Sequence, residues 1–365
     1  RDRGGIEAIL LKYQQVEETV RVPQTVNGLA DMDPGFDYRL NIRGNYDELG
    51  DPVPRGAPRA LTPSGENRFS DSGSGRLELA RILTRPDHPL TARVYVNRTW
   101  HWLFGTGIVA TPSDFGQLGQ QPSHPELLDW LTQRFIDNGW STRTLIRQIL
   151  TSETWQQSGG VVEDWTTADP ENRLLHHYPL RRLEAESIRD AILAVSGRLD
   201  PTLYGPTLNP PRANEDSQKR LFSGPLDGNG RRSIYTRITI MEPPKFLALF
   251  NQPRPKIPTG RRDSTNTPAQ SLALLNDPFV ISQASFWADQ LVKRSEETIE
   301  SRIGAMFQRA FARWPDVSEV NRWQQATRDL AQLHGVAEAD ILSSQTVWQE
   351  IAHAIFNTKE FIYIE

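Results

Sequence analysis

The chain has 365 residues, of which 37% are hydrophobic and 24% charged, and its formal net charge is −4. This length and composition are typical of a globular protein with one large domain or two ordinary ones. The net charge argues against a nucleic-acid partner, and no apolar run is long enough to form a transmembrane segment. The lack of cysteine excludes disulfides, thiolate catalysis, cysteine-ligated zinc and covalent haem attachment in this chain.

The first 75 residues carry weak secondary-structure signals. An apolar stripe predicts a short helix over residues 6–19, and extended pieces are expected at residues 20–26 and 37–44. Residues 43–64 are too rich in proline and glycine for a helix and predict a surface loop. The chain begins with Arg1 and shows no signal peptide, so we expect it to be a piece of a longer protein.

Residues 74–197 are predicted to be helical. Ser123 and Glu126 have the spacing of a capping box, and Ser141 is a candidate N-cap for the helix that follows. Pro89 is suited to a first helical turn because its missing N–H costs nothing there. The predicted helices lie at residues 76–83, 89–104, 124–138, 142–150 and 180–195.

The remainder of the chain begins with long loops. Residues 198–232 are rich in Pro, Gly and Asn, the β-branched alternation of residues 233–240 predicts a strand, and residues 251–267 are again irregular. Helices are then predicted at residues 268–275, 278–295, 297–312, 316–333 and 343–356. The expected fold class is mainly α, a multi-helix domain with a small β component and long Pro/Gly-rich loops.

The domain prediction has two versions. Residues 1–365 form either one cooperative domain or two packed halves, residues 1–197 and 233–365, joined by the loop-rich basic segment 198–232. The stretches at residues 145–155 and 351–361 share a pattern: an amphipathic helix, a hydroxyl residue, and then an aromatic at the eleventh position. Equivalent helix ends in the two halves would explain this similarity, as would chance, because two segments are too few to define a repeat.

Several segments carry a family resemblance. They lie at residues 43–58, 88–109, 113–131, 141–155, 178–193, 267–280 and 356–365. On these segments the chain resembles the C-terminal domain of unknown function of large planctomycete proteins that also carry cytochrome c-like domains. The resemblance implies an exported, extracytoplasmic protein whose partners include upstream domains of the same polypeptide, with covalent haem only in such a domain. It supplies no catalytic residues, and Asn251 stands where the family usually has an aspartate.

The predicted helix 89–104 carries a polar strip. Arg93, Asn97 and His101 follow one another at intervals of four residues and therefore share a helix face. With Asp114 they are candidates for a catalytic cleft in which His101 would act as acid, base or ligand. The alternative is that these side chains satisfy buried carbonyl groups or partner carboxylates within the fold.

A basic segment lies between Arg212 and Arg262. It contains eleven Lys or Arg and four acidic residues, a balance of +7 that leaves −11 for the remainder of the chain. Arginine pairs bidentately with sulfate and carboxylate groups, so the segment predicts an anionic-ligand site. Its candidate residues are Arg231, Arg232, Arg237, Arg254, Arg261, Arg262 and Tyr235. The alternative is that these arginines pair with acidic residues elsewhere in the chain.

The predicted helix 180–195 carries charges of both signs. Ion pairs along its exposed surface are the expected role of Arg181, Arg182, Glu184, Glu186, Arg189 and Asp190.

The sequence shows no fixed-spacing metal motif among its seven histidines, so no metal ligand set is predicted. Clustered oxygen ligands at residues 44–54 and 214–218 leave calcium open as a structural ion. Two functions follow from these features. The first is an accessory or binding module of an exported, redox-associated protein that binds an anionic, sulfated polysaccharide. The alternative is a carbohydrate-active enzyme or an oxidoreductase coupled to an upstream haem domain, so the sequence leaves open whether the chain is an enzyme.

Overall fold

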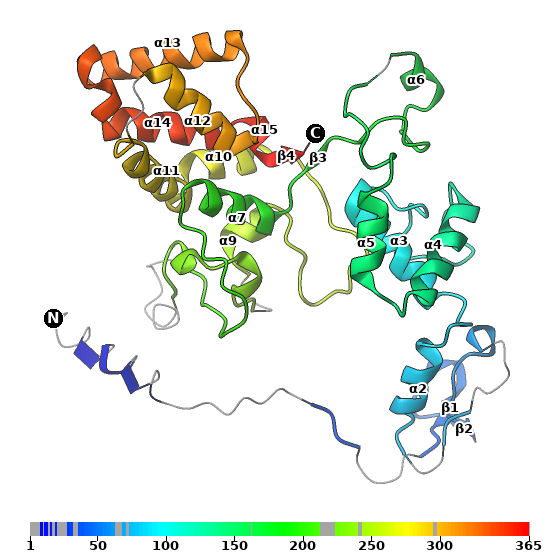
Figure 1. Cartoon of the computed structure of the whole chain (residues 1–365). Coiled ribbons are helices and arrows are strands. Elements are labelled where there is room, and N and C mark those ends of the chain that lie inside the picture. The colour runs from blue at the N-terminus through cyan, green and yellow to red at the C-terminus, as the bar shows by residue number, and fades with distance from the viewer. Residues whose placement is uncertain are drawn as a thin grey trace. The chain divides into compact units, whose positions relative to one another are not determined.

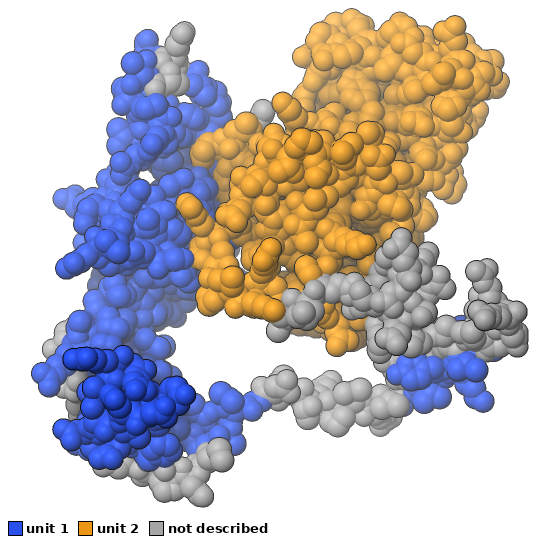
Figure 2. All heavy atoms as spheres, turned by 180° about the vertical axis from the view of Figure 1, so that it is seen from behind, with its two compact units in different colours: residues 1–178 blue, residues 179–365 orange. Residues whose placement is uncertain are grey.

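A computed structural model describes residues 8–9, 11–13, 15–16, 19, 28–31, 36–62, 68–70, 73–161, 163–211, 223–239, 243–294 and 298–364. The chain divides into two compact units, unit 1 (residues 1–178) and unit 2 (residues 179–365), which Figure 2 shows in blue and orange. The division falls at Tyr178–Pro179, ahead of the helix expected at 180–195. Of the expected helix 6–19 the described residues, 8–9, 11–13, 15–16 and 19, are helical, and the extended piece 20–26 and the oxygen-ligand cluster 214–218 lie outside the described residues.

Unit 1 contains a small hairpin and a three-helix bundle (Figure 1). The hairpin pairs β1 with β2 in antiparallel orientation; β1 lies in the extended piece expected at residues 37–44, and β2 lies in the stretch 43–64 that the sequence indicated as loop. The elements of unit 1 are β1 (Arg39–Asn41), η1 (Ile42–Gly44), β2 (Leu49–Pro52), η2 (Arg59–Leu61), α2 (Arg76–Leu83), α3 (Thr91–Phe104), α4 (Pro125–Asp137), α5 (Thr142–Leu150) and α6 (Glu163–Ala168). α3, α4 and α5 pack together, and their buried apolar side chains form the core of this unit.

The helix starts of unit 1 show how side chains fix local structure. Ser141 accepts a hydrogen bond from the Thr144 N–H at 3.3 Å and caps α5, as predicted. The predicted capping box at Ser123 is wrong, because the Ser123 hydroxyl donates to the carbonyl of Ile108 instead. Pro89 lies before α3 rather than in its first turn. The Nδ1 atom of His88 accepts from the N–H groups there, including that of Thr91 at 3.1 Å.

Unit 2 is mainly helical. Its elements are β3 (Arg181–Arg182), α7 (Ala185–Val195), η3 (Gly228–Gly230), η4 (Ser233–Tyr235), α9 (Lys245–Leu249), α10 (Pro268–Asn276), α11 (Pro278–Leu291), α12 (Ile299–Phe311), α13 (Val317–Leu333), η5 (Glu338–Ser343), α14 (Gln345–Phe356), α15 (Lys359–Ile362) and β4 (Tyr363–Ile364). α11 packs along α14, and α13 packs against both α12 and α14. Trp287, Trp348 and Phe356 are fully buried among these helices.

The fold class is confirmed: the chain is mainly α, with short strands in both units. The strand expected over residues 233–240 is wrong, because Ser233–Tyr235 forms a 3-10 helix and Thr236 makes only an isolated bridge to Leu208. Its alternation was not matched by a neighbouring strand that could complete a sheet. Among the described residues, no helix is long and apolar enough to cross a membrane.

Candidate functional site

The polar strip on α3 makes bonds within unit 1. Asn97 is fully buried; its Nδ2 donates to the Val109 carbonyl at 3.0 Å and its Oδ1 accepts from the Val109 N–H at 2.8 Å. Arg93 pairs with Asp129 on α4, and an Asp114 carboxylate oxygen accepts from the N–H of Gly116 at 2.8 Å. Arg93 and Asn97 therefore link α3 to other parts of unit 1, and Asp114 stabilises its own loop. A catalytic role for these residues stays a prediction.

Close packing explains the tight turn after α3. A Cβ atom at Gly107 would lie 2.8 Å from Asn97 Nδ2, so only glycine allows the chain to pass this amide. His101 is half-buried on the same helix, with its ring edge-on to Trp102 at 5.4 Å. A catalytic role for His101 stays a prediction.

Three of the seven predicted ligand-binding residues, Arg231, Tyr235 and Arg262, make internal contacts. The Arg231 guanidinium stacks over the Tyr235 ring, 4.1 Å from its centroid, and donates to the carbonyls of Thr202 and Tyr204. Arg262 pairs with Glu184, at 3.1 Å, and with Glu186. Internal contacts thus occupy Arg231 and Arg262.

The other arginines of this set are exposed. Arg232 lies 3.8 Å from Asp190 and remains open to solvent. Arg237, Arg254 and Arg261 are exposed, and the structure gives their side chains no hydrogen-bond or ion-pair partner among the described residues. These four arginine side chains are exposed to solvent, where a ligand could reach them.

The expectation of a surface helix laced with ion pairs at residues 181–190 needs correction. Arg189 is buried, and its guanidinium donates to the carbonyls of Arg231, at 3.0 Å, and Asp227, at 2.8 Å. Arg181 and Arg182 lie on β3 rather than on α7. Burial lowers the pKa of Arg189, and the contact with Phe279, at 5.4 Å from the ring centroid, gives it an aromatic neighbour. The Arg189 side chain therefore links α7 to the backbone of residues 227–231 by hydrogen bonds.

Arg182 belongs to a polar cluster around Asn251. The Asn251 Oδ1 atom accepts hydrogen bonds from Arg182 Nη2 at 2.7 Å, from Gln270 Nε2 at 3.1 Å and from the Thr265 hydroxyl at 3.1 Å. Burial lowers the pKa of Arg182. The hydrogen bonds that the structure shows for this guanidinium all go to neutral oxygens, including Gln270 Oε1 at 2.8 Å.

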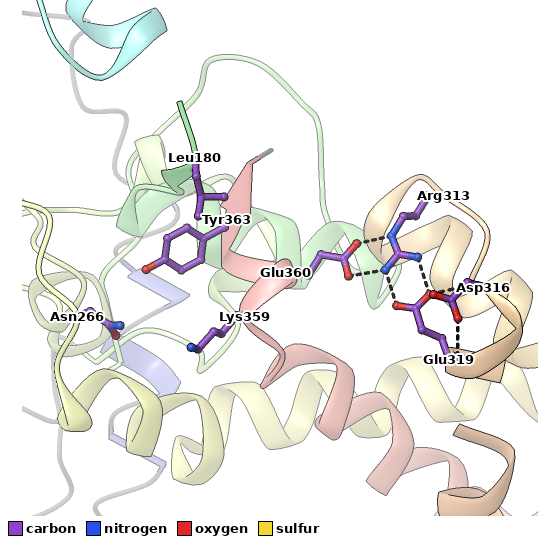
Figure 3. A pocket seen from close by; sticks show the side chains of 8 residues that line it. All are labelled: Leu180, Asn266, Arg313, Asp316, Glu319, Lys359, Glu360 and Tyr363. Atoms are coloured by element: carbon purple, nitrogen blue, oxygen red, sulfur yellow. Dashed lines mark hydrogen bonds and ion pairs between the residues drawn. The ribbon is translucent and has the colours of Figure 1, made fainter. Parts of the chain in front are cut away.

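A pocket of about 620 Å³ opens in unit 2, beside β3 and β4 (Figure 3). It is lined by Leu180, Asn266, Arg313, Asp316, Glu319, Lys359, Glu360 and Tyr363. Its volume lies within the range of small-molecule sites. In Figure 3, Asn266, Lys359 and Tyr363 gather at one end, and the carboxylates surround Arg313 at the other.

Arg313 organises the charged end of the pocket. Its guanidinium donates to both carboxylate oxygens of Glu319, at 2.7 and 2.8 Å, and to both of Glu360, at 2.5 and 2.7 Å. Such paired, charge-assisted bonds fix both partners in orientation. The bond to Arg313 is the main reason that the pKa of Glu319 lies below its usual value.

Asp316 adds a third fixed carboxylate. It is the N-cap of α13, where its side chain accepts from the Glu319 N–H at 2.8 Å while the Asp316 N–H donates to Glu319 Oε2 at 2.9 Å. The hydrogen bond from the Glu319 N–H is the main reason that the pKa of Asp316 lies below its usual value. Asp316 and Glu319 are therefore charged at neutral pH and act as hydrogen-bond acceptors.

The opposite end of the pocket offers polar groups to a ligand. Lys359 is exposed, and neither its ammonium group nor the Asn266 amide has a hydrogen-bond partner among the described residues. Sequence reasoning missed all eight lining residues, because they come from four separate segments of the chain. The available signals were the capping-box spacing of Asp316 and Glu319, which was not used, at the start of the helix predicted over 316–333, and the similarity of residues 351–361 to 145–155.

The described residues contain no group of three or more histidine, aspartate or glutamate side chains that could hold a metal ion. The fold and the pocket define a mainly helical protein of two units with a polar cavity in unit 2. The family described as PSD1, protein of unknown function (DUF1553), matches residues 75–327. The chain belongs to this family. No curated protein and no solved structure matches the chain.

Proposed function

We propose that this chain is a binding module whose pocket around Arg313 holds a neutral, hydroxyl-rich ligand of the saccharide class. The observation that carries the proposal is the lining of the pocket, with donors at Lys359 and Asn266 and fixed acceptors at Asp316 and Glu360. A hydroxyl group both donates and accepts hydrogen bonds, so a sugar can satisfy both kinds of group at once.

The charge of the pocket favours a neutral ligand over a polyanion. Its two cations, Arg313 and Lys359, face three carboxylates, Asp316, Glu319 and Glu360, which gives 2 − 3 = −1. Two of these carboxylates have lowered pKa values and keep their charge at neutral pH. They are poor proton donors, and this supports binding rather than general acid catalysis.

Titration calorimetry with cellohexaose, xylohexaose and chitohexaose tests the proposal. We expect one of these neutral saccharides to bind, and Lys359→Met to weaken that binding about tenfold, as expected when one charge-assisted hydrogen bond is lost. Lys245→Met is the matched control, because Lys245 is an exposed lysine outside the pocket. Wild-type protein that binds none of the three saccharides would show the proposal to be wrong.

A second candidate is an anionic polysaccharide held on the basic segment. It is supported by the exposure of Arg237, Arg254 and Arg261, none of which has a side-chain partner among the described residues. The triple variant with alanine at these positions should elute from a heparin column at lower salt than the wild type, because each lost cation weakens the salt-dependent attraction. Equal elution salt for the two proteins would contradict this candidate.

The setting of the chain is part of the same proposal. We place it in an exported, extracytoplasmic polypeptide of planctomycete type, as an accessory module to upstream domains of which one carries covalent haem. Calcium remains a candidate structural ion near residues 44–54. Cell fractionation followed by haem staining of the full-length polypeptide tests the setting, and a full-length protein found in the cytoplasm without haem would contradict it.

A further inference from the structure

A second hollow lies beside the loop that joins α12 to α13. This groove has a volume of about 300 Å³ and is lined by Thr298, Glu300, Ser301, Gly304, Trp314, Pro315 and Val320. The groove and the Arg313 pocket have no lining residue in common. The loop and the start of α13 contribute to both sites. Arg313, Asp316 and Glu319 line the pocket, whereas Trp314, Pro315 and Val320 line the groove.

Trp314 is exposed and yet held in place. Its side chain is 69% exposed. The ring lies against Gly304 on α12 so closely that a Cβ atom there would be 2.9 Å from Trp314 Cζ3. With its amide oxygen turned toward the loop, Gln308 accepts hydrogen bonds from Trp314 Nε1 at 3.0 Å and from its backbone N–H at 3.1 Å. The indole is thus fixed in orientation by the glycine below it and the amide beside it.

A fixed and exposed aromatic ring is suited to stacking. It offers a large apolar face, and little conformational entropy is lost when a ligand covers it. The hydroxyls of Thr298 and Ser301 serve the capping box of α12, so they are occupied. The Glu300 carboxylate is exposed and has no partner among the described residues.

An apolar face next to a hydroxyl acceptor matches one ligand class. The C–H groups on one face of a pyranose ring pack on indole, while the hydroxyls at the ring edge donate to a carboxylate. We propose that the Trp314 groove is a second saccharide subsite, which binds sugar units of the same chain that occupies the Arg313 pocket. This inference rests on the proposed function, and it adds that the ligand is an oligosaccharide long enough to pass over the α12–α13 loop.

The test compares long and short saccharides on the full chain. Titration calorimetry is carried out with the hexasaccharide that the wild type binds and with the corresponding disaccharide. Trp314→Ala should weaken hexasaccharide binding about tenfold, in keeping with the loss of one aromatic stacking contact. It should leave disaccharide binding at the pocket unchanged. Trp130→Ala, which removes a 50% exposed tryptophan from α4 in unit 1, is the matched control.

Two further variants separate stacking from folding. Gly304→Ala keeps the tryptophan but displaces its ring, because the new Cβ would lie 2.9 Å from it. This variant should weaken hexasaccharide binding as Trp314→Ala does, even though alanine favours the helix. Trp314→Phe retains an aromatic face and should restore most of the binding.

The outcomes distinguish the subsite from the pocket. Hexasaccharide binding that Lys359→Met weakens and Trp314→Ala leaves unchanged would overturn the subsite and preserve the proposed function. Binding that depends on Trp314 and is unaffected by Lys359→Met would overturn the pocket instead. Wild-type protein that binds neither saccharide would overturn both.

Discussion

The ends of α5 and α14 are two regions of the molecule with the same local structure and different roles. In unit 1, the Ser152 hydroxyl donates to the Ile149 carbonyl at 2.6 Å, and the N–H of Trp155 donates to the Ser152 carbonyl at 3.1 Å. In unit 2, Thr358 donates to the Ile355 carbonyl at 2.7 Å, and Phe361 to the Thr358 carbonyl at 3.3 Å. Each hydroxyl ends a helix and directs an aromatic ring toward a core.

The two regions differ at the positions between the hydroxyl and the aromatic residue. In unit 2 these positions are Lys359 and Glu360, which line the Arg313 pocket. In unit 1 they are Glu153 and Thr154, and the Thr154 carbonyl accepts from Gln157 in the same turn. The comparison teaches that the backbone pattern serves folding in both units, whereas the two variable positions contribute to a site only in unit 2.

Removing the aromatic residue tests whether both helix ends serve folding. Phe361→Ala should lower the free energy of unfolding by about 3–4 kcal/mol, because the ring is 4% exposed and leaves a cavity. Trp155→Ala should cost less, because Trp155 is half-buried. Urea denaturation measures both values, and equal costs would contradict this ranking of the two ends.

The polar strip on α3 provides a second contrast with the pocket, because Asn97 and Arg93 of the strip form hydrogen bonds and an ion pair within unit 1. Asn97→Ala should lower the free energy of unfolding by about 2–3 kcal/mol, because it leaves the N–H and carbonyl of Val109 buried without partners. His101→Ala, on the same helix face, is the control and should cost less. The measurement is again urea denaturation. If Asn97→Ala left the free energy of unfolding unchanged, the structural role of Asn97 would be contradicted and the strip would again be a candidate functional site.

Asn251→Asp sharpens the comparison by adding charge to a structural cluster near the pocket. A carboxylate at this position would give the Arg182 guanidinium, now bonded to neutral oxygens, a charged partner. We expect an increase of about 1 kcal/mol in the free energy of unfolding, from replacing a neutral hydrogen bond by a charge-assisted one. A lower melting temperature in calorimetry would show that the buried charge costs more than the pair contributes.

Acidification should affect unit 2 slightly, through the Arg313 network. Glu319 and Asp316 have pKa values below their ordinary values of 4.5 and 3.8. Their contribution to stability is fully present above about pH 4.5 and is lost as the pH falls through the lowered pKa values. Urea denaturation between pH 6 and pH 3, set beside the variant Glu319→Gln, checks this. The variant should show a shallower pH dependence, and identical profiles would exclude Glu319 as the cause.

The sequence by itself determined the helices and the class of the fold. The apolar periodicity of residues 268–356 placed α10 to α14 within a few residues of their ends, because each amphipathic helix must bury one face. Ser141 was recognised as a cap from local spacing alone. The same local reasoning failed at residues 233–240, where alternation lacked a strand partner, and at Ser123, whose hydroxyl bonds to the distant Ile108 carbonyl.

Only the tertiary structure decided which polar side chains remain available to a ligand. Arg189, Arg231 and Arg237 look alike in the sequence, yet the first is buried on backbone carbonyls, the second stacks on Tyr235 and the third is exposed. The Arg313 pocket joins residues from segments as far apart in the chain as Leu180 and Tyr363. Which segments come together depends on how the helices pack against one another. The periodicity of a single sequence reports which face of a helix is buried, but not which other helix covers that face.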